Sequence, residues 1–129
     1  TLEVETEAGA DRLRLKGIDT PEFGRRGDPA EPFAEAAKAH AQGRVGSEVG
    51  LEFDRACGSN PLSSDACRDG FGRLLCYLRL ADGSDLNEEL LRLGLAEVYR
   101  VRGERFDRQF AYEEAEAAAR QEGLGIWGP

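Results

Sequence analysis

The sequence predicts a β-rich α+β domain in which a small barrel of strands, closed or nearly closed, is covered by helices. Several short segments alternate apolar and polar residues, as half-buried strands do, and three longer segments carry helical patterns. One of these helical segments separates the third predicted strand from the second. An open two-layer α+β sandwich is the alternative arrangement. The 129 residues suffice for one core and show no linker, so we expect a single domain over residues 1–129.

The strands are predicted from alternation with a period of two residues. They cover residues 1–6, 12–18, 47–54 and 73–80. The first two are joined by turn residues and therefore predict a hairpin. Gly17 in the second strand predicts a bulge that redirects the residues after it.

Three helices are predicted, within residues 29–44, from 85 to 94 and from 107 to 122. In the first, Asp28-Pro29 supplies a cap and a helix-initiating proline, although a start at Pro32 fits equally well. Its apolar face is expected to include Phe33, Ala36, Ala37 and Ala41. The second begins at an Asp85 cap with Glu88 three residues later. The third is expected to bury Phe110, Ala111 and Ala118.

The charge and hydrophobic composition exclude several classes of protein. With 40% hydrophobic residues the chain is not a disordered tail, and no apolar run reaches the roughly 20 residues of a membrane-spanning helix. A net charge of −8 argues against coating nucleic acid by bulk charge. Residues 11–27 are an exception, because five basic residues there surround three carboxylates. Such a mixture suits an anion bound together with a divalent cation, but an ordinary solvated strand edge is the alternative.

The cysteines predict a disulfide. Cys57 and Cys67 flank a loop rich in turn residues, whereas Cys76 lies in an apolar strand segment and is expected to be buried. Free thiols are the alternative, and zinc binding is disfavoured because the chain contains no CxxC pair. A Cys57–Cys67 bond would indicate an oxidising compartment, so we expect a secreted or periplasmic protein.

Two segments carry the residue types of phosphate chemistry. In residues 14–22 a strand leads into a loop, and Asp19 with a nearby backbone carbonyl suits a hard cation such as calcium or magnesium. Glu22 is placed to accept a proton from a water near that metal, and Arg14 suits a phosphoryl group. In the second segment, Asp69-Gly70-Phe71-Gly72-Arg73, glycines around an aromatic residue deliver Arg73 to the start of a strand. Either segment alone is equally consistent with an ordinary turn.

Taken together and in this order, these motifs resemble a known family, that of staphylococcal nuclease (thermonuclease). The matching segments are Arg14 with Asp19-Thr20-Pro21-Glu22, Glu35-Ala36, Leu51-Glu52-Phe53-Asp54, Asp69-Gly70-Phe71-Gly72-Arg73, Ala81-Asp82-Gly83, residues 86–96 and residues 123–127. The resemblance therefore runs through nearly the whole chain. It implies an OB-fold with a five-stranded β-barrel and three packed helices.

The resemblance also implies an activity and its residues: calcium-dependent cleavage of DNA and RNA phosphodiester bonds to 3′-phosphate ends. Asp19 would bind Ca²⁺ through its carboxylate, Thr20 through its carbonyl, and Glu22 would act at the metal site as general base. Arg14 and Arg73 would hold the scissile phosphate. The implied partner is a DNA or RNA substrate, with no membrane contact, and we expect a monomer.

The chain departs from the family pattern in three places. The family's first strand and a further metal-binding Asp would precede Thr1, so we expect a chain truncated at its N-terminus. In the nucleotide pocket, Phe71, Arg100 and Arg102 replace the family's residues and are expected to bind nucleotide through different contacts. The loop of residues 55–68, which holds the cysteine pair, is longer than usual and is expected to shape substrate access.

A catalytically silent barrel that binds nucleic acid or protein is the alternative function. A binding module has no need for Arg14, Glu22 and Arg73 together, so their joint presence favours catalysis. A third reading, an oligosaccharide-binding barrel, would require an exposed aromatic face, and Trp127 is expected to pack against the core instead.

Overall fold

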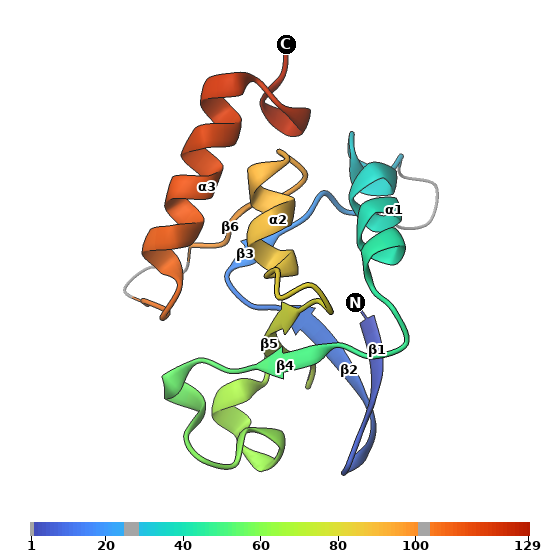
Figure 1. The fold of residues 1–129 in the computed structure, drawn as a ribbon, viewed down its shortest axis with the longest axis vertical. Helices are drawn as coiled ribbons and strands as arrows, with labels where there is room; N and C mark the ends of the chain where they lie inside the picture. The colour runs from blue at the N-terminus through green and yellow to red at the C-terminus, as the bar shows by residue number, and fades with distance from the viewer. Residues whose placement is uncertain (1, 25–28, 101–103) are drawn as a thin grey trace.

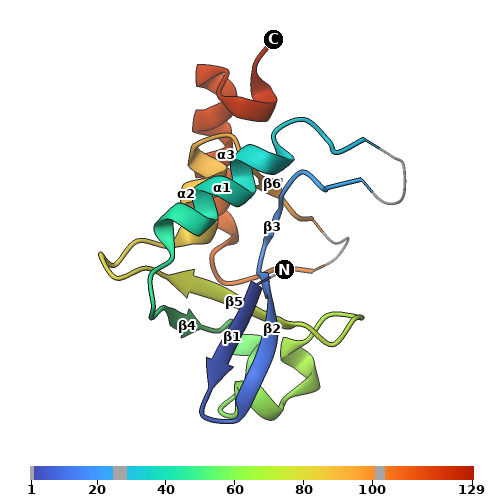
Figure 2. The ribbon, with the colours of Figure 1, turned by 90° about the vertical axis from the view of Figure 1, so that its right-hand side faces the viewer.

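A computed structural model describes residues 2–24, 29–100 and 104–129. Four strands form a curled mixed sheet in the order β1 (Leu2–Thr6), β2 (Gly9–Leu15), β5 (Leu74–Arg79) and β4 (Gly50–Glu52). A separate short pair joins β3 (Ile18–Asp19) to β6 (Glu97–Val98). The helices α1 (Ala34–Arg44), α2 (Leu86–Arg92) and α3 (Gln109–Glu122) gather at one end of the molecule, with the sheet at the other (Figures 1 and 2). This half-barrel with three helices confirms the predicted OB-like α+β class.

The sheet brings two distant segments of the chain together. β1 and β2 form the predicted antiparallel hairpin, with Leu2 opposite Leu13. β2 then pairs in parallel with β5, and this pairing sets Arg14 beside Leu75. Parallel strands require a long connection, which here contains α1 and β4. As a result, the end of β2 that carries Arg14 lies beside the start of β5, which directly follows Arg73.

The predicted strand over residues 12–18 is two strands, because a turn at Lys16-Gly17 separates β2 from β3. Gly17 adopts φ +82°, a left-handed conformation that favours glycine, and a Cβ there would lie 2.6 Å from the ring of Phe106. The buried amide of Asn87 on α2 supports the turn by donating to the Lys16 carbonyl at 3.0 Å. The turn redirects the chain so that Asp19 pairs with Glu97 of β6.

The helices differ from the prediction in their ends and in three side chains. α1 begins at Ala34, not at residue 29 or 32, because Phe33 lies in the left-handed region with φ +70°. Phe33 is consequently 44% exposed, and Ala36 is exposed as well, because the buried positions of α1 are Ala34 and Ala37. On α3 the buried positions are Tyr112, Ala115, Glu116 and Ala119, one helical stripe, and Phe110 lies off it at 75% exposure. Among the described residues, none of the helices is long and apolar enough to cross a membrane.

The predicted Cys57–Cys67 disulfide is present. It closes the loop between β4 and β5, which extends beyond the sheet at the end opposite the helices (Figure 1). The loop consists of short 3₁₀ turns at Arg55–Cys57, Pro61–Ser63 and Asp65–Cys67. Cys76 is a buried free thiol, and burial raises its pKa to about 12. It is therefore a packing residue rather than a reactive one.

Candidate active site

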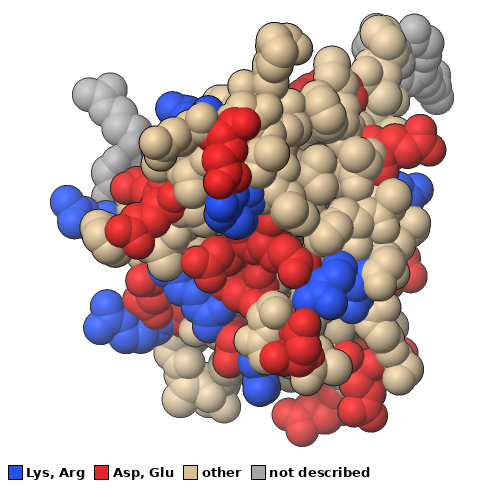
Figure 3. Space-filling model, turned by 45° about the horizontal axis from the view of Figure 1, so that its top comes forward, with Lys and Arg blue, Asp and Glu red and all other residues tan. Residues whose placement is uncertain are grey.

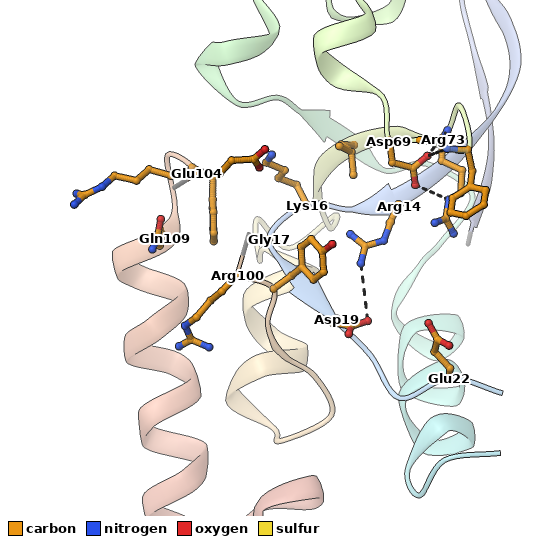
Figure 4. A pocket seen from close by; sticks show the side chains of 16 residues that line it. Arg14, Lys16, Gly17, Asp19, Glu22, Asp69, Arg73, Arg100, Glu104 and Gln109 are labelled. Atoms are coloured by element: carbon orange, nitrogen blue, oxygen red, sulfur yellow. Dashed lines mark hydrogen bonds and ion pairs between the residues drawn. The ribbon is translucent and has the colours of Figure 1, made fainter. Parts of the chain in front are cut away.

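A cavity of about 590 Å³ opens beside the ends of β2 and β3. Residues from separate parts of the chain line it, among them Arg14 of β2, Asp19 and Glu22 after the Gly17 turn, and Arg73 at the entry to β5. In Figure 4 these four side chains surround a common space. The same four residues belong to the two distant sequence motifs that predict phosphate chemistry, and the parallel pairing of β2 with β5 brings these motifs together.

Arg14 is held by contacts on two sides. Its guanidinium lies 3.9 Å from the carboxylate of Asp19 and 4.7 Å from the ring centroid of Tyr99. A cation above an aromatic face is attracted by the ring quadrupole, and a nearby carboxylate adds a charge interaction. The Arg14 side chain keeps 22% of its surface exposed, so the cation faces the cavity without being buried.

Arg73 is held in the same way by its own turn. Its Nε donates to Asp69 Oδ2 at 2.7 Å, and its guanidinium lies 5.4 Å from the ring centroid of Phe71. The other oxygen, Oδ1, accepts the backbone N–H groups of Phe71 and Arg73 at 2.9 Å. Burial alone would raise the pKa of Asp69, but these backbone and guanidinium hydrogen bonds outweigh it and hold the pKa below its ordinary value. Asp69 is therefore ionised wherever the site would work.

Asp19 is the last residue of β3, and Thr20 and Glu22 lie in the loop that follows it. The Asp19 carboxylate is 42% exposed, and Glu22 is exposed on a loop that is fixed by a hydrogen bond from the Glu31 N–H to the Glu22 carbonyl at 2.8 Å. All three residues also line a second cavity of about 690 Å³. Thr20 thus lies next to Asp19 and Glu22, but it does not line the cavity that contains the arginines.

The available donors at this loop are oxygens, the ligands that calcium and magnesium prefer. Their number is small, because no group of three His, Cys, Asp or Glu residues in the described part of the chain is arranged to hold a metal. Two carboxylates and a carbonyl would fill part of a calcium coordination sphere, which takes about six to eight oxygens. The oxygen atoms at this loop are thus of the type that a hard cation prefers, but they would supply only part of its coordination sphere.

Comparison with known proteins decides the family. The model of the family described as staphylococcal nuclease homologue matches residues 12–129, more than nine-tenths of the chain. The chain belongs to the staphylococcal nuclease family. The resemblance seen in the sequence motifs is thereby confirmed.

Proteins similar to this chain are named as endonucleases. The chain is 30% identical to a protein named probable endonuclease LCL3 of Schizophyllum commune, over 98% of this chain and 44% of that protein. It is 32% identical to endonuclease Htp3 of Saprolegnia parasitica, over 90% and 52% respectively. It is 35% identical to the SPbeta prophage-derived endonuclease YokF of Bacillus subtilis, over 98% and 40%. The chain therefore spans about half the length of these relatives or less.

Of the residues expected to bind nucleotide, Phe71 and Arg100 line the cavity of about 590 Å³ that contains Arg14 and Arg73. Phe71 is 73% exposed, so its ring presents an accessible face. Arg100 donates to the buried carboxylate of Glu116 at 2.9 Å, while its side chain stays 52% exposed. Arg102 lies outside the described residues. Phe71 and Arg100 thus both lie at the cavity, and Arg100 is also paired with Glu116.

Tyr99, for which the sequence predicts no role, also lines the cavity and lies against Arg14. Its position depends on β6, because the Tyr99 N–H donates to the Gly17 carbonyl at 2.9 Å. Glu116 of α3 fixes β6 in turn by accepting the Val98 N–H at 2.6 Å. A single tyrosine after a strand of two residues belongs to no recognisable sequence pattern. Its place beside Arg14 therefore becomes visible only in the folded structure.

Proposed function

We propose that this member of the staphylococcal nuclease family is a metal-dependent nuclease that hydrolyses phosphodiester bonds of DNA or RNA. The observation that carries the proposal is that Arg14, Asp19, Glu22 and Arg73 line one cavity. This pair of arginines and pair of carboxylates, among the charged residues of the cavity, match the needs of phosphoryl transfer, in which positioning and charge stabilisation matter more than covalent chemistry. The endonuclease names of the relatives support the same conclusion.

In this proposal Arg14 and Arg73 bind the non-bridging oxygens of the scissile phosphate. A guanidinium presents two donors in one plane, stays charged at any relevant pH and therefore matches a phosphate better than an ammonium does. The negative charge on these oxygens grows as water attacks, and the two arginines would stabilise it. Because the aromatic and carboxylate contacts hold both side chains, little reorganisation is required when the substrate arrives.

Glu22 would act as the general base. A bond forms between the water oxygen and phosphorus while the bond from phosphorus to the 5′ oxygen breaks, and Glu22 accepts the proton that the water loses. The 5′ oxygen leaves and takes a proton from solvent, so the products are a 3′-phosphate and a 5′-hydroxyl. The exposure of Glu22 leaves room for that water.

Asp19, the Thr20 carbonyl and Glu22 would hold calcium in this proposal. A bound calcium ion would supply Lewis-acid polarisation of a phosphate oxygen. The small number of protein donors predicts weak binding, of the order of the ~10⁻⁴–10⁻³ M affinity of extracellular calcium modules. The Cys57–Cys67 disulfide supports a related proposal, that the protein works in an oxidising compartment and is secreted or periplasmic.

The proposal is tested by cleavage of a fluorescently labelled oligonucleotide during calcium titration. We expect cleavage to rise with calcium in the millimolar range, to stop when excess chelator is added and to return when calcium is restored. Cleavage that persists in excess chelator would refute the metal requirement. A protein that binds the oligonucleotide but cleaves neither DNA nor RNA at any calcium concentration would be the silent binding module instead.

A further inference from the structure

The turn that carries Arg73 is closed by its own hydrogen bonds. The Asp69 N–H donates to the Arg73 carbonyl at 2.9 Å, and the Gly72 N–H donates to the Asp69 carbonyl at 3.0 Å. These bonds fix the shape of the turn, and the pairing of β2 with β5 starts only after it, with Leu13 opposite Leu74. The sheet therefore sets where β5 begins, while further contacts have to hold the turn itself in place, because a misplacement of about 1 Å can cost a reaction about 100-fold.

Arg68, the residue before the turn, makes that connection. Its Nη1 donates to the Gly72 carbonyl and to Asp11 Oδ1, both at 2.9 Å. Its Nη2 donates to Asp11 Oδ2 at 2.8 Å and to the Leu62 carbonyl at 3.0 Å. One guanidinium thus joins three parts of the chain, namely the Arg73 turn, the strand β2 and the disulfide-closed loop.

The ion pair between Arg68 and Asp11 has the geometry of a strong interaction. Both carboxylate oxygens of Asp11 accept from Arg68, in the bidentate arrangement that gives the strongest charge-assisted hydrogen bonds. Both side chains are largely buried, with 24% and 22% of their surfaces exposed. The hydrogen bond from Arg68 lowers the pKa of Asp11, so the pair persists in mild acid.

The same strand carries Arg14, three residues beyond Asp11. A second contact from this strand reaches the turn, since Arg12 Nη2 donates to the Phe71 carbonyl at 2.8 Å. On the other side, Arg68 directly follows Cys67, which is fully buried and bonded to Cys57. The turn is therefore held between β2 and the closed loop.

We propose that Arg68 is a positioning residue, which, through Asp11 and the disulfide-closed loop, sets the place of Arg73 relative to Arg14. The inference rests on the proposed function for its effect on catalysis, but the geometric claim stands by itself. It gives the loop of residues 55–68 a role in holding the site, beyond the shaping of substrate access.

The test compares Arg68→Ala with Arg92→Ala, a matched control. Arg92 makes an equally bidentate pair with Glu122, at 2.8 and 2.9 Å, but does not line the cavity. We expect Arg68→Ala to lower kcat about 10- to 100-fold in the folded protein with a smaller change in KM, and Arg92→Ala to leave both unchanged. In an Arg73→Ala background, Arg68→Ala should cause no further loss of kcat, because it acts through Arg73. Equal losses in both backgrounds would overturn the proposal.

A second measurement does not depend on cleavage. ¹⁵N relaxation of the Gly72 amide and of Arg73 Nε should show rigid groups in the wild type, with order parameters of about 0.85, and values below about 0.6 in Arg68→Ala. Unchanged order parameters and chemical shifts at these groups would also overturn the proposal. A wild-type protein without nuclease activity would count against the proposed function alone. The relaxation experiment would still decide whether Arg68 positions Arg73.

Discussion

Each of the two arginines at the site is paired with one carboxylate and one aromatic ring. Arg14 has Asp19 and Tyr99, and Arg73 has Asp69 and Phe71. Aromatic and carboxylate contacts restrict a side chain that would otherwise sample many rotamers, and immobilising such a side chain costs about 0.5–1.5 kcal/mol when it happens on binding. In this protein that ordering has occurred before any substrate binds.

Glu22 gives a prediction about the proton-transfer step. Replacing Glu22 by Gln keeps its size and removes its basicity, so we expect kcat at saturating calcium to fall about 10²- to 10⁴-fold. Calcium affinity, measured separately by calorimetry, should fall as well because a carboxylate ligand is lost. Glu31→Gln is the matched control, since Glu31 lines the neighbouring cavity and has no proposed role in the reaction. Near-normal turnover of Glu22→Gln at saturating calcium would remove the general-base assignment.

At the level of elements, the sequence was most informative where a local pattern decides the structure. Alternation located the hairpin of β1 and β2, and the Asp85 cap located α2, where Asp85 Oδ1 accepts the Glu88 N–H at 3.1 Å. Both features depend on neighbours a few positions apart, which a sequence displays directly. Arg14, Asp19, Glu22 and Arg73 were indicated instead by two motifs, distant in the chain, whose order resembles that of the family.

Features that depend on distant contacts could not be predicted. The start of α1 is set by the backbone of Phe33, and the orientation of Phe110 is set by which stripe of α3 faces the core. The Arg68–Asp11 pair joins residues 57 positions apart. None of these leaves a periodic trace in the sequence, because each is decided when the elements pack together.

The disulfide gives a prediction about this loop. Thiol titration of the unfolded, unreduced chain should find one free thiol, and three after reduction, since Cys76 alone is free in the structure. Reduction should lower the free energy of unfolding by about 3 kcal/mol by the chain-entropy estimate. Cys76→Ala is the control, and its unreduced chain should titrate no thiol. Three thiols in the unreduced wild-type chain would contradict the bond.

For the whole molecule, the net charge repels nucleic acid, whereas the arginines of the cavity attract its phosphate groups. The chain carries −8, and on the face shown in Figure 3 acidic side chains gather near the middle with basic ones around them. Such a surface repels a polyanion in general. In the proposed function, affinity for nucleic acid would therefore come from the cavity of Arg14 and Arg73 and a cation bound beside it.

Acid should destabilise the protein through a small set of carboxylates. The pKa of Asp11 is lowered by the Arg68 hydrogen bond, and in Asp54 and Asp69 hydrogen bonds outweigh the effect of burial, so all three pKa values lie below the ordinary 3.8. A lowered folded-state pKa contributes stability above pH 3.8 that is lost as the pH falls through the folded value. Glu88 acts in the opposite direction, because burial raises its pKa.

We therefore expect the melting temperature to be nearly constant from neutral pH to about pH 4.5 and to fall steadily below it. Asp54→Asn removes the charge and one of the two oxygens that accept the Tyr77 hydroxyl and the Ala56 and Asp107 N–H groups, so it should melt lower at neutral pH and depend less on acid. Thermal melts followed by circular dichroism from pH 7 to pH 2 provide the measurement. A wild-type melting temperature that does not change down to pH 2 would contradict this account of the carboxylates.

The central claim is that Arg14 and Arg73 act on one phosphate from two sides of one cavity. The most direct measurement is the single-turnover cleavage rate of a labelled oligonucleotide by Arg14→Ala and Arg73→Ala at saturating calcium. Arg79→Ala serves as the control, because Arg79 lies on β5 and does not line the cavity. Each cavity variant should fold normally and lose about 10²- to 10³-fold in rate, while Arg79→Ala keeps the wild-type rate. Folded Arg14→Ala or Arg73→Ala protein that cleaves at the wild-type rate would contradict the claim.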